Sequence, residues 1–302
     1  MTNNSCFYLT VLQLQNILSY FCKMILIADS GSTKTSWCLT DSNGITKYFF
    51  TNGINPFFRT TEDIADELRV KLLPETGADV EQIFFYGAGV INQEKGNIVK
   101  IALQQLFPKA EIEVQSDLLA AARATLGKEK GIACILGTGS NSCLYNGSEI
   151  TGHVPPLGFI LGDEGSGAVM GRKLIGDFLK GIMPKGIAEK FKAGFKLTYA
   201  EFLDSVYKKE KPNQFLAQFV PFLSENISQE YCSTVVETSF EEFVKRNIYR
   251  YSGFAKQPIC FVGSVAFHFQ EQLKNVLEKN HLQFKTVLKE PLNGLLKFHI
   301  EK

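Results

Sequence analysis

The stretch Ile25-Leu26-Ile27-Ala28-Asp29-Ser30-Gly31-Ser32-Thr33-Lys34-Thr35 decides the fold of this chain. Its apolar residues predict a buried strand, and the acid with small, hydroxyl-rich residues after it predicts a tight turn. A turn of this kind presents backbone N–H groups that suit a phosphate. The plan recurs where Gly137-Thr138-Gly139-Ser140-Asn141 follows the apolar strand 132–136. Two such units predict two loops that hold the phosphates of one nucleotide.

Composition narrows the class of partner. The 302 residues are 45% hydrophobic and carry a formal net charge of +1. This balance gives room for a sizeable core and argues against nucleic acid or a membrane surface as the main partner, which leaves a small molecule. The 7 cysteines are scattered, with no Cys-x-x-Cys pair. An odd number without such spacing indicates neither a disulfide framework nor a zinc site, and fits a reducing cytoplasm.

The first 23 residues differ from the rest of the chain. They include the apolar run Phe7-Tyr8-Leu9-Thr10-Val11-Leu12, but glutamines and an asparagine interrupt the pattern and no basic residue precedes Lys23. The segment is too polar for a membrane span and lacks the charged start and cleavage site of a signal peptide. We predict that Met24 is the natural start, so that residues 1–23 are an extension that is not native. The alternative is an N-terminal helix packed on the surface.

The first half of the chain predicts a sheet covered by helices. After Met24, strands at 25–28, 36–39 and 45–50 form a meander, with Asp41-Ser42-Asn43-Gly44 as one of its turns. Helices and strands then alternate, with helices at 61–73, 96–106 and 117–126 and strands at 82–86 and 111–114. This alternation predicts a partly parallel sheet with helices on its faces.

The second half repeats that plan. A strand from Gly131, a glycine-rich turn and a strand lead to a hairpin turn at 145–148, and a helical region follows from Glu164 to about Arg250. A strand into a small-residue turn at 259–264, a strand at 284–288 and a short helix after Pro291 complete the chain. The duplication predicts two related domains that face one another across a cleft, with a hinge near 127–131.

Asp29 is the first candidate for ligand chemistry. It lies at the carboxyl end of a predicted strand, where open α/β sheets bind ligands, and it could hold Mg²⁺ through water. The alternative is ordinary turn chemistry, because Asp, Ser and Gly favour turns. The loop is not a Walker A motif, since the residue before Lys34 is not glycine.

Three further acidic residues allow both a structural and a functional interpretation. Asp117 follows Gln115-Ser116 at a strand end, so it is either a helix N-cap or the base that accepts a proton from a hydroxyl attacking ATP. Asp163 and Glu164 lie between glycines ahead of the predicted helix, where one acid would suffice as a cap. The Gly-Thr-Gly turn at 137–139 could likewise be a simple hairpin turn.

The four histidines give no sign of a metal site. His153, His268, His281 and His299 show no metal-ligand spacing. We therefore interpret all of them as structural.

Five motifs occur in an order that resembles the N-acetylglucosamine kinases. They are Asp29-x-Gly31-x-Thr33-Lys34-Thr35, Asp117 with the helix 119–124, Gly137-Thr138-Gly139-Ser140, Leu161-Gly162-Asp163-Glu164-Gly165-Ser166, and Val262-Gly263-Ser264-Val265. That group is part of the BadF/BadG/BcrA/BcrD ATPase family, within the superfamily of sugar kinases, actin and heat-shock chaperone ATPases. The resemblance runs from Met24 to the C-terminus.

The resemblance implies an α/β fold of two ribonuclease-H-like, actin-like ATPase domains that flank a nucleotide cleft. They would span residues 24–128, joined by the C-terminal helix at 290–302, and residues 129–289. The implied metal-associated acid is Asp29 and the implied general base is Asp117. The residues implied for ATP are Gly31, Ser32, Thr33, Lys34, Thr35, Gly137, Thr138, Gly139, Gly263 and Ser264. Those implied for the sugar are Asn55, Ser140, Asn141 and Asp163.

Some positions depart from the family pattern. The turn near adenosine is Gly263-Ser264, where many relatives have two glycines, and Leu157-Gly158-Phe159 replaces the Trp-Gly before the acidic loop. The zinc motif of the bacterial repressor and glucokinase branch is absent, and the scattered cysteines offer no counterpart to the bridging iron–sulfur cluster of dehydratase activators.

From these features we expect an ATP- and Mg²⁺-dependent kinase, acting as a homodimer, that phosphorylates the 6-hydroxyl of an amino sugar, with N-acetylglucosamine first and glucosamine or N-acetylmuramate as alternatives. An ATPase that drives a partner protein and a sugar-responsive regulator are the rival functions.

Overall fold

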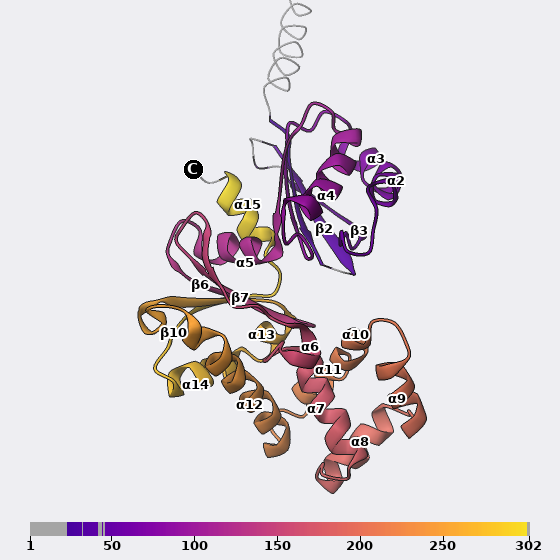
Figure 1. Cartoon of the computed structure of the whole chain (residues 1–302), viewed down its shortest axis with the longest axis vertical. Helices are drawn as coiled ribbons and strands as arrows, with labels where there is room; N and C mark the ends of the chain where they lie inside the picture. The colour runs from indigo at the N-terminus through magenta and orange to yellow at the C-terminus, as the bar shows by residue number, and fades with distance from the viewer. Residues whose placement is uncertain (1–22, 32, 42–43, 45, 301–302) are drawn as a thin grey trace, which may run out of the picture. The chain divides into compact units, whose positions relative to one another are not determined.

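The computed structural model describes residues 23–300 except 32, 42, 43 and 45. The predictions for residues 1–22, for Ser32 and for the centre of the turn at 42–43 lie outside the described residues. The chain divides into two compact units, which are described separately below. Unit 1 runs to Ala120 and includes the chain from Leu295 onward, and unit 2 is Ala121–Gly294 (Figure 1).

Unit 1 is built on a five-stranded mixed sheet. Its strands are β1 (Ile25–Ser30), β2 (Lys34–Thr40), β3 (Thr46–Asn52), β4 (Gln82–Gly87) and β5 (Glu111–Ser116). Their order is β3-β2-β1-β4-β5, with β1 antiparallel to β2 and parallel to β4. The central strand β1 buries Leu26, Ile27 and Ala28 completely, as an apolar run flanked on both sides requires.

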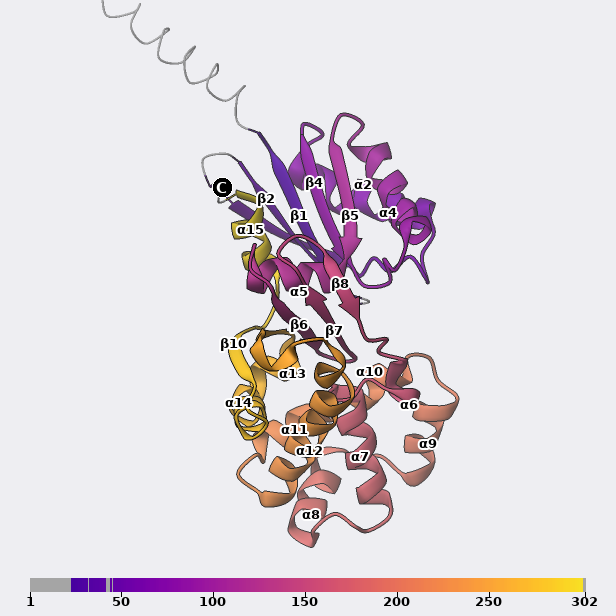
Figure 2. The same ribbon diagram turned by 60° about the vertical axis from the view of Figure 1, so that its left-hand side comes forward.

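Helices cover this sheet and close its core. They are α2 (Thr61–Lys71), α3 (Leu73–Thr76) and α4 (Gln93–Leu106), with α5 (Asp117–Leu126) leading out of β5 and α15 (Leu292–Ile300) at the end of the chain. Helices α2 and α4 lie on the same side of the sheet (Figure 2). Trp37, Phe85 and Leu103 belong to the core that these helices form with the sheet.

Unit 2 contains a second five-stranded sheet. Its strands are β6 (Gly131–Leu136), β7 (Ser140–Tyr145), β8 (Ile150–His153), β9 (Pro258–Val262) and β10 (Gln283–Leu288). The order is β10-β9-β6-β7-β8, and β6 is antiparallel to β7 and parallel to β9. This is the plan of unit 1 repeated strand for strand, so the predicted duplication and the predicted fold class are confirmed.

Most of the helices of unit 2 lie between β8 and β9 in the sequence. They are α6 (Gly158–Leu161), α7 (Gly167–Leu179), α8 (Lys185–Gly194), α9 (Tyr199–Tyr207), α10 (Pro212–Ala217), α11 (Val220–Glu225), α12 (Glu230–Arg246), η1 (Ile248–Arg250) and η2 (Phe254–Lys256), and α13 (Ser264–His268) and α14 (Gln270–Lys279) follow β9. Phe191, Phe219 and Phe243 are completely buried in the core that these helices share with the sheet.

The predicted start of the long helical region was wrong. Helix α7 begins at Gly167 and not at Glu164, because the side chain of Ser166 accepts a hydrogen bond from the Val169 N–H and caps the helix there. Across the described part of the chain, every helix is too short or too polar to traverse a lipid bilayer.

Candidate active site

The first predicted phosphate loop is the turn between β1 and β2. Its ends are joined by a hydrogen bond from the Gly31 N–H to the Lys34 carbonyl (3.0 Å), and the Thr33 carbonyl accepts from the Gly53 N–H (2.9 Å). Behind the turn, the fully buried Ser30 and Thr35 share a hydrogen bond of 2.7 Å between their hydroxyls. The turn is therefore anchored to both strands and to the segment after β3.

Two side chains that the sequence assigned to phosphate are engaged within unit 1. The Thr35 hydroxyl donates to the Asn52 carbonyl (3.0 Å), so it holds the loop from behind. The Lys34 ammonium lies 4.6 Å from the centre of the Phe50 ring, a cation–π distance. The Thr35 hydroxyl therefore supports the loop, and the Lys34 ammonium lies beside the loop over an aromatic ring.

The candidate carboxylates of unit 1 lie at one edge of its sheet. Asp29 precedes Ser30 at the end of β1, and Asp117 follows Ser116 at the end of β5. The parallel registers align Ser30 with Gly87 on β4 and Gly87 with Ser116. The ends of β1 and β5 are two strand spacings apart, about 10 Å. Two half-buried carboxylates therefore lie at the same end of this sheet.

Asp117 is not the residue that caps helix α5. The Ser116 hydroxyl accepts a hydrogen bond from the Leu119 N–H (3.2 Å), as an N-cap does, and Asp117 is the first residue of the helix. Burial raises the pKa of Asp117, although the backbone N–H groups of Leu118 and of Asp117 itself lower it. A carboxylate with a raised pKa is a better proton acceptor, which suits a general base.

Asn55, the sugar candidate of unit 1, is buried and tightly enclosed. Its Oδ1 accepts a hydrogen bond from the Phe57 N–H (3.0 Å). A β-carbon on Gly89, whose φ is +84°, would lie only 2.3 Å from that oxygen. Glycine at position 89 is therefore what allows the β4–α4 turn to approach Asn55 so closely.

The second predicted phosphate loop is docked on the start of α7. The Gly137 carbonyl accepts from the Gly167 N–H (2.8 Å), and the Thr138 carbonyl accepts from the Ala168 N–H (3.1 Å). Within the loop, the Gly137 N–H donates to the Gly139 carbonyl (2.9 Å). These bonds fix the loop that joins β6 and β7 to the helix that follows the acidic loop.

The two adjacent acids have different partners. Asp163 has a φ of +54°, and its Oδ1 accepts from the Ser140 N–H (3.2 Å). Glu164 is paired with Arg246 and accepts from the Asn247 side chain. Burial raises the pKa of Asp163, the Ser140 N–H lowers it, and the charge of Glu164 raises it further. Since Ser166 caps α7, the alternative in which one of these acids serves only as the helix cap is excluded.

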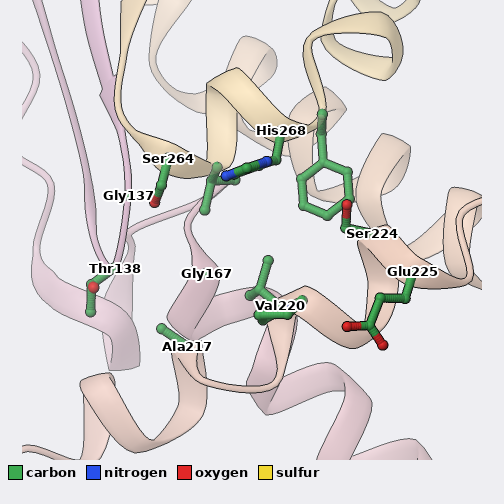
Figure 3. A pocket seen from close by; sticks show the side chains of 12 residues that line it. Gly137, Thr138, Gly167, Ala217, Val220, Ser224, Glu225, Ser264 and His268 are labelled. Atoms are coloured by element: carbon green, nitrogen blue, oxygen red, sulfur yellow. The ribbon is translucent and has the colours of Figure 1, made fainter. Parts of the chain in front are cut away.

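A cavity of about 470 Å³ opens beside the second loop (Figure 3). Its lining comes from the second loop, the start of α7, the α10–α11 segment and α13. These residues are Gly137, Thr138, Gly167, Ala217, Val220, Pro221, Ser224, Glu225, Ser264, Val265, His268 and Phe269. The structure thus brings the predicted residues Gly137, Thr138 and Ser264 to one cavity of unit 2.

The walls of this cavity were largely missed by sequence reasoning. Ala217, Val220, Ser224 and Glu225 come from the helical region, where apolar spacing is typical of a core and signals no ligand site. His268 was interpreted as structural, yet it lines the cavity. The polar pair Ser224-Glu225 directly after the apolar residues 220–223 was the faint signal available.

Gly263 shapes the turn that precedes α13. Its φ is +122°, and a β-carbon there would lie 2.3 Å from the Leu136 carbonyl oxygen. Its N–H donates to the Leu288 carbonyl (2.9 Å). Only glycine allows this turn to lie against β6. The position of the turn places Ser264 and Val265 in the cavity wall.

The residues at the end of β1 are compatible with Mg²⁺ bound together with a nucleotide. Mg²⁺ usually keeps several waters and takes one or two carboxylates plus substrate phosphates, not a cage of protein ligands. Asp29 supplies one carboxylate beside the first loop, and no group of three or more His, Cys, Asp or Glu ligands occurs within the described residues. This donor set fits a metal that is held chiefly by phosphate and water.

The two repeated sheets and the loop-lined cavity define an actin-like ATPase. Residues 28–294 match the BadF/BadG/BcrA/BcrD ATPase family, and the chain belongs to this family. A solved structure of a proposed N-acetylglucosamine kinase from Porphyromonas gingivalis is 46% identical, with a TM-score of 0.88 over 92% of this chain and 99% of that one. A proposed N-acetylglucosamine kinase from Chromobacterium violaceum shares the fold at 16% identity, with a TM-score of 0.72 over 91% of this chain and 98% of that one.

One curated relative is also similar in sequence. It is the N-acetyl-D-glucosamine kinase of Dictyostelium discoideum, which is 28% identical over 168 residues. That match spans 50% of this chain and 53% of the relative, so it covers about half of each protein.

Proposed function

We propose that this protein is an ATP-dependent sugar kinase that transfers a phosphoryl group to the 6-hydroxyl of an amino sugar, with N-acetylglucosamine as the first candidate. The observation that carries the proposal is the cavity of unit 2, which joins a glycine loop at the start of α7 to an apolar wall of Val220, Val265 and Phe269. Such a cavity suits a nucleotide, with the phosphates at the loop and the base against the apolar wall.

Unit 2 would bind the nucleotide through three groups. The second loop, Gly137 to Gly139, would face the phosphates with its backbone. Gly263 and Ser264 would contact the adenosine, and the α10–α11 segment would enclose the base. Unit 1 would add the first loop, Gly31 to Thr35, with the Lys34 ammonium as a cation for the phosphates.

The carboxylates would divide the chemistry. Asp117 would accept a hydrogen bond from the attacking hydroxyl and take its proton as the bond to phosphorus forms. Asp163 would accept from another hydroxyl of the sugar, and Asn55, Ser140 and Asn141 would orient the ring. The raised pKa of Asp117 supports its role, because a carboxylate that ionises reluctantly holds a proton more strongly once it receives it.

Asp29 would hold Mg²⁺ through water. When bound, the ion neutralises the charge that develops on the transferred phosphoryl group. The homodimer and the cytoplasmic location expected from the sequence belong to the same proposal, and light scattering on the purified protein tests the first of them.

The names of the relatives support the choice of sugar. The Porphyromonas gingivalis protein is similar over nearly its whole length, and its proposed substrate is N-acetylglucosamine. The Dictyostelium discoideum relative is an N-acetyl-D-glucosamine kinase. The replacement at Leu157-Gly158-Phe159 makes glucosamine and N-acetylmuramate worthwhile alternatives in the assay.

The test is ADP release by purified protein with Mg-ATP, alone and with N-acetylglucosamine, glucosamine, N-acetylmuramate or glucose. Strong stimulation by one sugar supports the kinase and identifies its substrate. ¹³C NMR of the product then locates the phosphate, and a shift of C6 with two-bond phosphorus coupling supports the 6-hydroxyl. Hydrolysis of ATP that no sugar changes would overturn the proposal in favour of an ATPase that drives a partner.

A further inference from the structure

The side-chain amide of Asn141 has a determined orientation. The Ser142 backbone N–H lies 2.9 Å from Asn141 Oδ1. A backbone N–H can only donate, so the atom it meets must be the carbonyl oxygen of the amide and not its nitrogen. This hydrogen bond therefore fixes the amide of Asn141 with Oδ1 toward the backbone of Ser142 and Nδ2 away from it.

The same oxygen is bonded by His153 on the neighbouring strand β8. His153 Nε2 lies 2.9 Å from Asn141 Oδ1. Because this oxygen can only accept, His153 must carry its proton on Nε2. Partial burial also lowers the pKa of His153, which favours the neutral ring with Nδ1 unprotonated.

The other end of the amide is available to a ligand. Both hydrogen bonds involve Oδ1, and Asn141 Nδ2 has no hydrogen-bond partner among the described residues. Asn141 is half-buried, and its Nδ2 is not sealed from solvent. The preceding residue, Ser140, donates its N–H to the carboxylate of Asp163. Asn141 therefore directly follows a residue that is bonded to the acidic loop.

We propose that His153 is a positioning residue that holds the Asn141 amide so that its NH₂ group donates to an oxygen of the sugar. This inference rests on the proposed function, and it adds a requirement to it. The substrate must present a hydrogen-bond acceptor, either a hydroxyl oxygen or the carbonyl of an acetamido group, to Asn141. The side chain of His153 touches Asn141 and acts through it.

Steady-state kinetics of four variants test the role. His153→Ala should raise the KM for the sugar about 3- to 10-fold with little change in kcat, as expected for one lost neutral hydrogen bond. His153→Gln, which keeps a donor, should restore most of the affinity. Asn141→Asp keeps the acceptor for Ser142 but removes the NH₂ donor, so it should raise the KM at least as much. In the double variant, His153→Ala should have no further effect on Asn141→Asp.

The matched control is Thr151→Val, an exposed change on the same strand β8. It should leave the sugar KM unchanged. An equal KM increase in Thr151→Val, a fall in kcat without a KM effect in His153→Ala, or additive effects in the double variant would each overturn the positioning role.

NMR separates this inference from the proposed function. Long-range ¹H–¹⁵N spectra of the imidazole, assigned by the signal lost in His153→Gln, should show the Nε2–H form in the unmodified protein. A Nδ1–H form overturns the inference even if the protein is a kinase. If the unmodified protein turns over ATP independently of every sugar, the proposed function fails and the sugar contact of Asn141 fails with it, whatever the tautomer.

Discussion

The Asp117 carboxylate contributes differently to the proposed chemistry and to the stability of the fold. Asp117 lies at the first position of α5, where burial raises its pKa and only two backbone N–H groups oppose the shift. Ser116 already caps the helix, so the fold does not depend on the Asp117 side chain for that purpose. The side chain is therefore expected to matter more for turnover than for stability.

The substitution Asp117→Asn tests the catalytic half of this expectation. The amide keeps the shape of the side chain but cannot take a proton, so kcat should fall about 10²- to 10⁴-fold with the KM for ATP nearly unchanged. Sugar-stimulated ADP release measures the effect. The control is Asp66→Asn on the exposed face of α2, which should be near normal. Turnover of Asp117→Asn within a factor of a few of the unmodified enzyme would rule out the general-base role.

The same variant tests the stability half. A carboxyl group whose pKa is raised in the folded state binds its proton more tightly there than in the unfolded chain, so ionisation at higher pH weakens the fold. Asp117→Asn should therefore have an equal or higher Tm at pH 7, and the difference should disappear as the pH falls toward about 4, the ordinary pKa of Asp. Thermal melts at several pH values measure this, and a lower Tm for the variant at pH 7 would contradict it.

At the scale of elements, helix α7 connects the acidic loop to the cavity wall. Gly171 lies where α7 crosses α10, and a β-carbon on it would be only 1.9 Å from the Leu216 carbonyl oxygen. The next residue, Ala217, lines the cavity. The close crossing of these two helices therefore sets the position of one cavity wall.

Gly171→Ala should force this crossing apart. We expect a loss of about 1–3 kcal/mol of stability, typical of overpacking, together with a higher KM for ATP. Gly176→Ala in the same helix is the matched control, since its β-carbon would have no neighbour within 4 Å. Removing a helical glycine there should add up to about 1 kcal/mol. Urea unfolding compares the two, and equal effects from both would contradict the role of the crossing.

The strands were more predictable than the elements that finish the site. Runs such as 25–28 and 132–136 are apolar on both faces because each strand is central in its sheet, and such runs are visible in the sequence. Helix α5 was predicted at its observed bounds. The start of α7 was not, because the sequence does not reveal that Ser166 caps the helix while Glu164 contacts Arg246 and Asn247 from a distant segment.

The cavity wall could not be predicted from local patterns. Val220 and Ser224 line the same cavity as Gly137, although more than 80 positions separate them from it in the sequence, because α11 packs on α7. The sequence records only their apolar and small character, which is equally typical of a core. The two glycine-containing loops and the carboxylates of Asp29 and Asp117, by contrast, lie at strand ends, which are visible in the sequence.

On the scale of the whole molecule, the chain contains two separate hydrophobic cores. The only tryptophan of the sequence, Trp37, is completely buried in the core of unit 1, where its Nε1–H donates to the Thr51 hydroxyl (2.9 Å). Its fluorescence therefore reports on unit 1, while far-UV circular dichroism reports on both units.

This arrangement predicts that nucleotide will shift the two signals differently. ATP at about 100 times its Kd should stabilise unit 2 by about 2.7 kcal/mol, which corresponds to roughly 5–10 °C for a unit of this size. The part of the dichroism melt that comes from unit 2 should move by this amount, and the Trp37 transition should move less. Identical shifts in both signals would show that the two units unfold as one cooperative body.

The last helix gives unit 1 an unusual dependence on the order of synthesis. Residues from Leu295 onward belong to unit 1, where His299 stacks on Phe84 at 3.7 Å and bonds to the Tyr86 hydroxyl at 2.8 Å. On a ribosome, the 174 residues of Ala121–Gly294 emerge before this helix does. Unit 2, although encoded later, can therefore complete its core first. Unit 1 is synthesised earlier but lacks this helix until the end, so the aromatic surface around Phe84 stays exposed to chaperones until then.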